Sequence, residues 1–126
     1  MRLVHPLATA RGKGPAKSGV EHWWMQRLTA IALVPLMIWF VSAMAGLAGA
    51  SHEDATIWLT DPLNAALMIA FIVAAFHHAQ LGLQVVIEDY IHGPLWEYGL
   101  LISVKLLAIL ATIVAVLSIL RVMFGG

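Results

Sequence analysis

The sequence of 126 residues contains no cysteine and few charged side chains. The absence of cysteine excludes disulfides, cysteine-ligated iron–sulfur clusters and cysteine-based zinc sites in this chain. Only 11% of the residues are charged and 61% are hydrophobic, whereas soluble domains carry roughly 25% charged residues. A chain this short cannot bury so much apolar surface in a water-facing fold. Membrane lipid is therefore the expected environment. The formal net charge of zero gives no general attraction to nucleic acid.

Three runs reach the length of roughly 20 apolar residues that spans a bilayer as a helix. They are residues 28–50, 63–87 and 99–120. The first two hold no Asp, Glu, Lys or Arg, and the third holds only Lys105. The sequence therefore predicts an all-α membrane protein with three transmembrane helices. With their polar ends included, these helices are expected at about residues 18–50, 62–90 and 94–123.

Short local signals predict where these helices begin and end. Ser18-Gly19-Val20-Glu21 fits a capping box, so the first helix is expected to start near Ser18. Asp61-Pro62 supplies an N-cap and a first helical residue for the second helix. Gly93-Pro94 ends the second helix and starts the third. Residues 51–61 are expected to form a loop between the first two helices.

The distribution of basic residues predicts the orientation. Residues 1–17 hold four Lys or Arg and no acid, whereas residues 51–61 hold neither Lys nor Arg. The positive-inside rule therefore places the N-terminus in the cytoplasm, with residues 1–17 as a flexible basic leader and residues 18–126 as the membrane domain. A leader that docks on lipid headgroups or a partner is the alternative. Because the leader is short for a transit peptide, a bacterial inner membrane is favoured over a mitochondrial inner membrane.

Two histidines, His77 and His78, lie deep within the second apolar run. His78 is about 24 Å along the helix axis from the helix start. At 100° per residue, His78, Gly82 and Asp89 share one face, and His77 lies 100° away from it. Ionisable residues inside a membrane are costly to bury and point to function, and neutral imidazole is a common ligand of metals and haem. A histidine that donates to a neighbouring carbonyl, and a glycine that packs against a helix, remain the alternatives.

The positions of the other histidines limit how a haem could be bound. They lie in flanks, in loops or at a membrane edge: His5, His22, His52 and His92. None of them can meet His78 at its depth in the membrane. If His78 binds haem together with a second histidine, that histidine must therefore belong to another chain. A homodimer that supplies His78 twice also satisfies this condition.

Polar residues at the expected cytoplasmic edge of the membrane suit a redox ligand. Glu88-Asp89-Tyr90 ends the second helix, where a tyrosine hydroxyl can hydrogen-bond a quinone carbonyl and a carboxylate can relay protons. Arg27 lies about 13 Å from the expected start of the first helix and either snorkels to the headgroups or points inward to an anion. An aromatic belt with solvated acids is the simpler interpretation of residues 88–90.

Taken together, these residues resemble the hydrophobic membrane anchor of succinate dehydrogenase, respiratory complex II. The resemblance rests on His78-Ala79 with Gly82 and on Asp89-Tyr90, eleven residues after the histidine. Gln26-Arg27-Leu28-Thr29-Ala30 is similar to the segment near the start of that family's first helix. The similarity covers about residue 20 to the end and implies a bundle of transmembrane helices from more than one chain.

The resemblance implies roles for particular residues. His78 would be one axial ligand of a haem b iron, with the other ligand from a companion anchor of the cytochrome b type. Gly82 would pack against the haem, and Arg27 would lie near its propionates or in the quinone pocket. Tyr90 would hydrogen-bond ubiquinone, and Asp89 would support that site.

The resemblance also implies partners and an activity of the whole complex. The partners are a flavoprotein subunit, an iron–sulfur subunit, the cytochrome b-type anchor and membrane lipid. This chain would hold no succinate-oxidising site and would be inactive alone. The anchor of a quinol:fumarate reductase is the first alternative, and a haem-free structural or transport protein of the membrane is the second.

Overall fold

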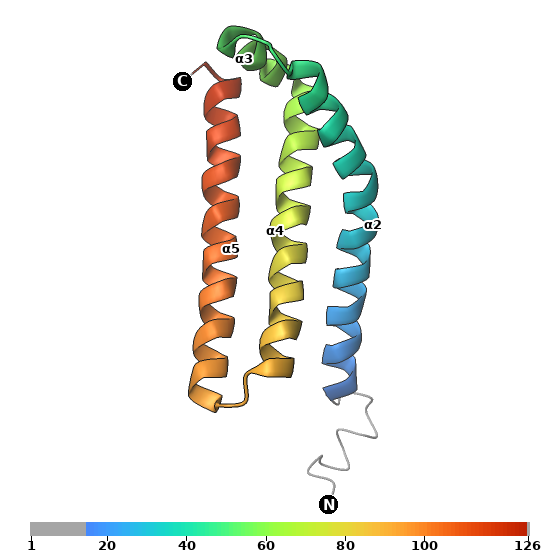
Figure 1. Ribbon diagram of the computed structural model, residues 1–126, viewed down its shortest axis with the longest axis vertical. Helices are drawn as coiled ribbons and strands as arrows, with labels where there is room; N and C mark the ends of the chain where they lie inside the picture. The colour runs from blue at the N-terminus through green and yellow to red at the C-terminus, as the bar shows by residue number, and fades with distance from the viewer. Residues whose placement is uncertain (1–14, 126) are drawn as a thin grey trace, which may run out of the picture.

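The computed structural model describes residues 15–125 (Figure 1). These residues form four α-helices and no strand. The helices are α2 (Pro15–Leu47), α3 (His52–Thr60), α4 (Pro62–Tyr90) and α5 (Pro94–Met123). Three of them, α2, α4 and α5, are long and apolar enough to cross a membrane, so the predicted all-α class with three spanning helices is confirmed. Residues 1–14 of the expected leader lie outside the described residues.

The helix α4 lies in the middle of the molecule, with α2 packed on one side and α5 on the other (Figure 1). The start of α2 and the connection from α4 to α5 lie at one end of the molecule, and α3 lies at the other (Figure 1). Few side chains of this row of helices are buried within the chain: Thr29, Ala65, Leu81, Ile87 and Ile119. Most apolar side chains therefore face outward, as expected for a chain covered by lipid or by other membrane subunits.

The prediction of a loop at residues 51–61 is wrong, because most of this segment forms α3. Ser51 is its N-cap, and the Ser51 hydroxyl accepts a hydrogen bond from the Asp54 amide at 3.0 Å. The Asp54 carboxylate in return accepts a hydrogen bond from the Ser51 amide at 3.3 Å. This capping box uses aspartate where the usual pattern has glutamate or glutamine. The short helix contacts the ends of α4 and α5, and Trp58 stacks on Trp39 of α2 with centroids 6.0 Å apart.

The first spanning helix also differs from its expected start. It begins at Pro15 rather than near Ser18, so the last three residues of the expected leader are helical. Proline suits a first helical position, because an amide hydrogen at that position would have no partner within the helix and proline lacks one. Ser18 consequently lies inside the helix, and the expected capping box at that position is wrong. At the other end the helix stops at Leu47, and Gly49 adopts a φ of 82°.

The boundaries of α4 and α5 lie where their terminal residues indicate. The Asp61 carboxylate accepts hydrogen bonds from the Leu63 and Asn64 amides at 2.8 and 3.3 Å, and Pro62 begins α4. Helix α5 begins at Pro94 after the Gly93 N-cap. With these boundaries, His78 lies near the middle of α4, and Asp89 and Tyr90 lie at its end.

Candidate functional site

The site is centred on His78, where α4 meets α2. The Nδ1 atom of His78 lies 3.0 Å from the Oγ1 atom of Thr29 on α2. The Thr29 side chain is only 7% exposed, and Thr29 is the one polar residue buried within the described part of the chain. In that part of the chain this hydrogen bond alone joins two of the spanning helices through side chains. It ties the imidazole to α2 at mid-depth in the row of helices.

An apolar groove of about 400 Å³ lies beside His78. Apart from the imidazole it is lined by residues of α2, which are Ala30, Leu33, Val34, Met37 and Ile38. Arg27 precedes Ala30 and Val34 by three and seven residues, so it lies on the same face of α2, one turn nearer the start of the helix. Its guanidinium carbon is 5.1 Å from the centre of the Trp23 ring. A cation therefore lies on the face of α2 that lines the groove.

Gly82 lies one turn from His78 on the same face of α4. A Cβ atom added at Gly82 would meet nothing within 4 Å. Packing within the described residues therefore does not require a glycine at this position. If close packing is the reason for the glycine, the group that packs there comes from outside the described residues. This observation fits a cofactor or a partner helix beside the imidazole.

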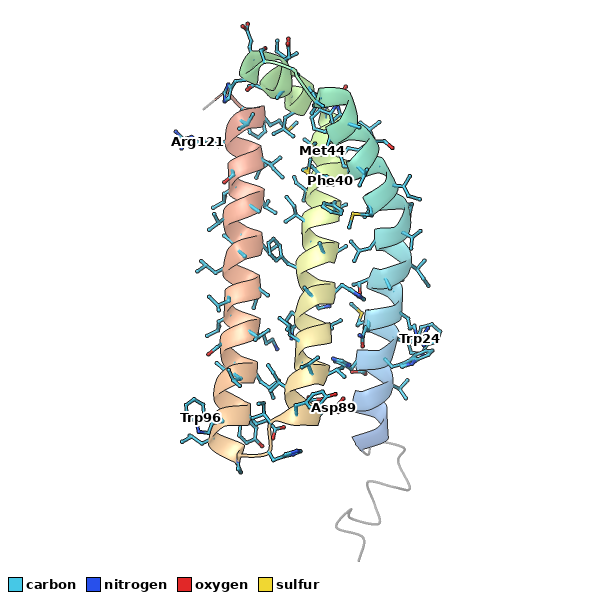
Figure 2. The ribbon with its side chains drawn as sticks, viewed as in Figure 1. Trp24, Phe40, Met44, Asp89, Trp96 and Arg121 are labelled. Atoms are coloured by element: carbon cyan, nitrogen blue, oxygen red, sulfur yellow. The ribbon has the colours of Figure 1, made fainter. Side chains whose placement is uncertain are left out.

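The end of α4 forms a second polar region. Asp89 and Tyr90 are exposed, Tyr90 by 75%, and Figure 2 shows Asp89 at the end of α4 nearest the start of α2. His22, near the start of α2, has a buried Nε2 atom with no hydrogen-bond partner. Such atoms usually find a partner in water, a ligand or another chain. Asp89 is about 16 Å along the helix axis from His78, so the structure does not bring Asp89 and Tyr90 to the imidazole.

His77 belongs to a different part of the molecule from His78. It lines a hollow of about 330 Å³ between α4 and α5, together with Gln80 and Lys105. The two neighbouring histidines thus face different helices, as their 100° separation predicts. In residues 15–125, no three His, Asp or Glu side chains gather to hold a metal ion. A lone imidazole suits a metal group that already brings most of its own ligands, as haem does with its four ring nitrogens.

Sequence reasoning missed two polar contacts. One is the pairing of Thr29 with His78, for which the only signal is a hydroxyl at matching depth on the preceding helix. The other is a ladder along α4, in which Gln80 donates to Gln84 at 3.3 Å and Gln84 donates to Glu88 at 3.0 Å. Its four-residue spacing could have been read from the sequence. The ladder begins at Gln80, beside the His77 hollow, and ends near the terminus of α4.

Comparison with known proteins places this arrangement in a family. Residues 1–120 match the family described as succinate dehydrogenase/fumarate reductase transmembrane subunit. The chain is 36% identical over 114 residues, 90% of each chain, to a succinate dehydrogenase hydrophobic membrane anchor subunit of Rickettsia bellii. It is 29% identical over 104 residues to the subunit of that name from Paracoccus denitrificans, covering 82% of this chain and 81% of the relative.

A third relative, the succinate dehydrogenase membrane anchor subunit of Reclinomonas americana, is 30% identical over 113 residues, covering 87% of this chain and 86% of the relative. No solved structure matches the chain. The family match covers nearly the whole sequence and agrees with the three spanning helices. The chain therefore belongs to the family of transmembrane subunits of succinate dehydrogenase and fumarate reductase.

Proposed function

We propose that this chain is a membrane anchor of succinate dehydrogenase that shares a haem b with a second anchor, of the cytochrome b type, and contributes to a ubiquinone-reducing site. It would hold the flavoprotein and iron–sulfur subunits on the membrane. The observation that supports the haem most directly is the imidazole of His78, held by Thr29 beside an open apolar groove. The names of the relatives support the anchor role.

The residues around His78 fit a haem. The Nε2 atom of His78 forms no hydrogen bond within the described residues, so in the tautomer with the proton on Nδ1 it could occupy an axial position on haem iron. The empty space at Gly82 leaves room for a flat macrocycle, and the α2 groove offers an apolar wall. Arg27, on the groove face of α2, would neutralise a propionate. When bound, haem b would accept and release one electron.

In this proposal the second axial ligand would come from another chain. Three of the other described histidines lie near the ends of the molecule, away from the depth of His78: His22 near the start of α2, His52 at the start of α3 and His92 between α4 and α5. His5 lies outside the described residues. His77 faces α5. The exposed apolar faces of α2 and α4 are consistent with a second membrane protein that covers the groove and supplies a histidine.

The end of α4 suits a quinone head group. The Tyr90 hydroxyl would donate a hydrogen bond to a quinone carbonyl, and Asp89 would orient the hydroxyl or pass a proton. The unpartnered Nε2 atom of His22 at the same end supports an unfilled polar site there. By the positive-inside rule, the basic leader supports a cytoplasmic position for this end, where the soluble subunits would dock.

The anchor of a quinol:fumarate reductase is the second candidate, because the description of the matching family names both enzymes. The two have the same architecture and differ in the net direction of the reaction and in the quinone. The relatives reported above are all succinate dehydrogenase subunits, and His78 argues for a haem-containing anchor. We therefore favour succinate dehydrogenase.

Gly82→Leu tests the proposed haem face. A leucine side chain would occupy the space beside the His78 imidazole, and overpacking typically costs about 1–3 kcal/mol. We therefore expect haem affinity to fall about tenfold or more, while the complex still assembles, because a Cβ atom at Gly82 meets nothing within 4 Å among residues 15–125. Haem absorbance per mole of complex, purified from membranes through a tag on this chain, measures the change.

Gly99→Leu is the matched control, because Gly99 of α5 also has open space around it but lies far from His78. It should retain haem at the level of the unmodified chain. Full haem content in Gly82→Leu would show that the macrocycle does not lie on this face of α4. Equal loss in both variants would point to a general effect of leucine on assembly and would also contradict the assignment.

A further inference from the structure

The Thr29 hydroxyl has three hydrogen-bonding neighbours. Its Oγ1 atom lies 2.8 Å from the carbonyl oxygen of Met25 and 3.0 Å from that of Gln26, both in the preceding turn of α2. The third neighbour is the Nδ1 atom of His78 at 3.0 Å. The side chain is 7% exposed, so water does not compete freely for these positions. The direction of each hydrogen bond can therefore be worked out by counting protons.

A hydroxyl has one proton to donate and two lone pairs that accept. Both carbonyl oxygens can only accept, so the Thr29 proton is directed back to its own helix, as is common for threonine within helices. The lone pairs of Oγ1 then face His78. The contact is satisfied when Nδ1 of His78 carries the proton and donates it to Thr29.

This assignment decides which nitrogen of His78 is free. A neutral imidazole with a proton on Nδ1 has its lone pair on Nε2. With the opposite assignment, Nε2 would hold the proton and could not bind a metal. Nothing in the described part of the chain hydrogen-bonds to Nε2, and the His78 side chain lines the apolar groove.

We infer that Thr29 is a positioning residue, whose hydroxyl accepts the Nδ1 proton of His78 and so fixes the ring and its tautomer for iron ligation through Nε2. This inference rests on the proposed haem function. A hydrogen bond from the second nitrogen makes imidazole a stronger electron donor to a bound metal. Because the contact is buried in a medium of low dielectric constant, its effect is greater than at a surface. A stronger donor favours ferric over ferrous iron.

The test compares Thr29→Val with Thr29→Ser. Valine keeps the size and branching of threonine but removes the hydroxyl, and serine keeps the hydroxyl but removes the methyl group. A hydrogen-bonding role and a packing role therefore predict opposite results. The complex is purified from membranes through a tag on this chain, and two quantities are measured: haem per mole of complex, and the midpoint potential of the haem in a redox titration.

We expect Thr29→Ser to match the unmodified complex in both quantities. In Thr29→Val, we expect the preference for ferric over ferrous haem to fall about tenfold, of the same order as the smallest effects of such partners on metal affinity. For a one-electron couple this is a shift of about 59 mV to more positive potential. If the valine variant does not assemble, Thr29→Ala replaces it, since alanine and serine differ by a single oxygen atom.

Three results would overturn the inference. Unchanged potential and haem content in Thr29→Val would show that the hydroxyl does not act on the iron, while the haem proposal itself would stand. A change in Thr29→Ser equal to that in Thr29→Val or Thr29→Ala would assign Thr29 a packing role. Absence of haem from the unmodified complex would reject the proposed haem function, and this inference with it.

Discussion

We expect His78→Ala to remove the haem from the assembled complex and His77→Ala to leave the haem spectrum close to that of the unmodified complex. We expect this contrast because the two neighbouring imidazoles face different helices. His78 lies beside the groove on α2 and opposite Thr29, and His77 lines the hollow between α4 and α5 with Lys105. Loss of the proposed ligand to haem iron would leave an open coordination position that alanine cannot fill. A reduced-minus-oxidised spectrum of the purified complex measures the outcome.

His77→Ala is the natural control for His78→Ala. The two substitutions remove the same imidazole from adjacent positions at the same depth, so their cost to helix insertion is nearly the same. Equal loss of haem from both variants would refute the assignment of His78. Retention of the full spectrum in His78→Ala would place the haem ligands elsewhere in the complex.

The second large effect is expected at the end of α4. Tyr90→Phe should lower succinate–ubiquinone activity about tenfold, because it would remove the proposed hydrogen bond to the quinone carbonyl, and leaving a polar partner unpaired costs about 1–3 kcal/mol. Oxidation of succinate with a soluble electron acceptor should be unchanged, because that reaction does not use the quinone site. The ratio of the two activities in the same preparation is the measured quantity.

Tyr98→Phe provides the matched control for Tyr90→Phe. Tyr98 lies at the same end of the molecule, near the start of α5, and is 67% exposed against 75% for Tyr90. Its loss should leave the ratio of activities unchanged. If Tyr90→Phe lowered both activities in parallel, failed assembly rather than a quinone contact would be the cause, and the role proposed for Tyr90 would be wrong.

Much of the fold follows from local sequence signals. The Asp61-Pro62 and Gly93-Pro94 pairs lie at the boundaries of α4 and α5, because a capping side chain and a proline without an amide have few other stable positions. Helix α3 was missed because its capping box ends in Asp54, and because a nine-residue helix at the end of a bundle gains most of its stability from packing. The start of α2 was misplaced because Pro15, three residues before the expected cap, can itself begin a helix.

The candidate site was only partly predictable for a related reason. The position of His78 in a long apolar run is visible in the sequence, and helical geometry alone separates it from His77. Its contact with Thr29 depends on how α2 and α4 slide along one another, which no local signal fixes. The open space at Gly82 likewise depends on the arrangement of the helices. Sequence thus predicted which residues of α4 share a face, and the structure added what meets them.

The measurement that tests the central claim most directly is a reduced-minus-oxidised absorbance spectrum of the complex, purified in mild detergent through a tag on this chain, with its subunits resolved on a gel. The account predicts a b-type haem together with two large soluble subunits and a second small hydrophobic chain. The same four subunits without haem would contradict it and would leave His78 as a structural histidine paired with Thr29. Haem on this chain alone would instead indicate a homodimeric cytochrome and contradict the shared site.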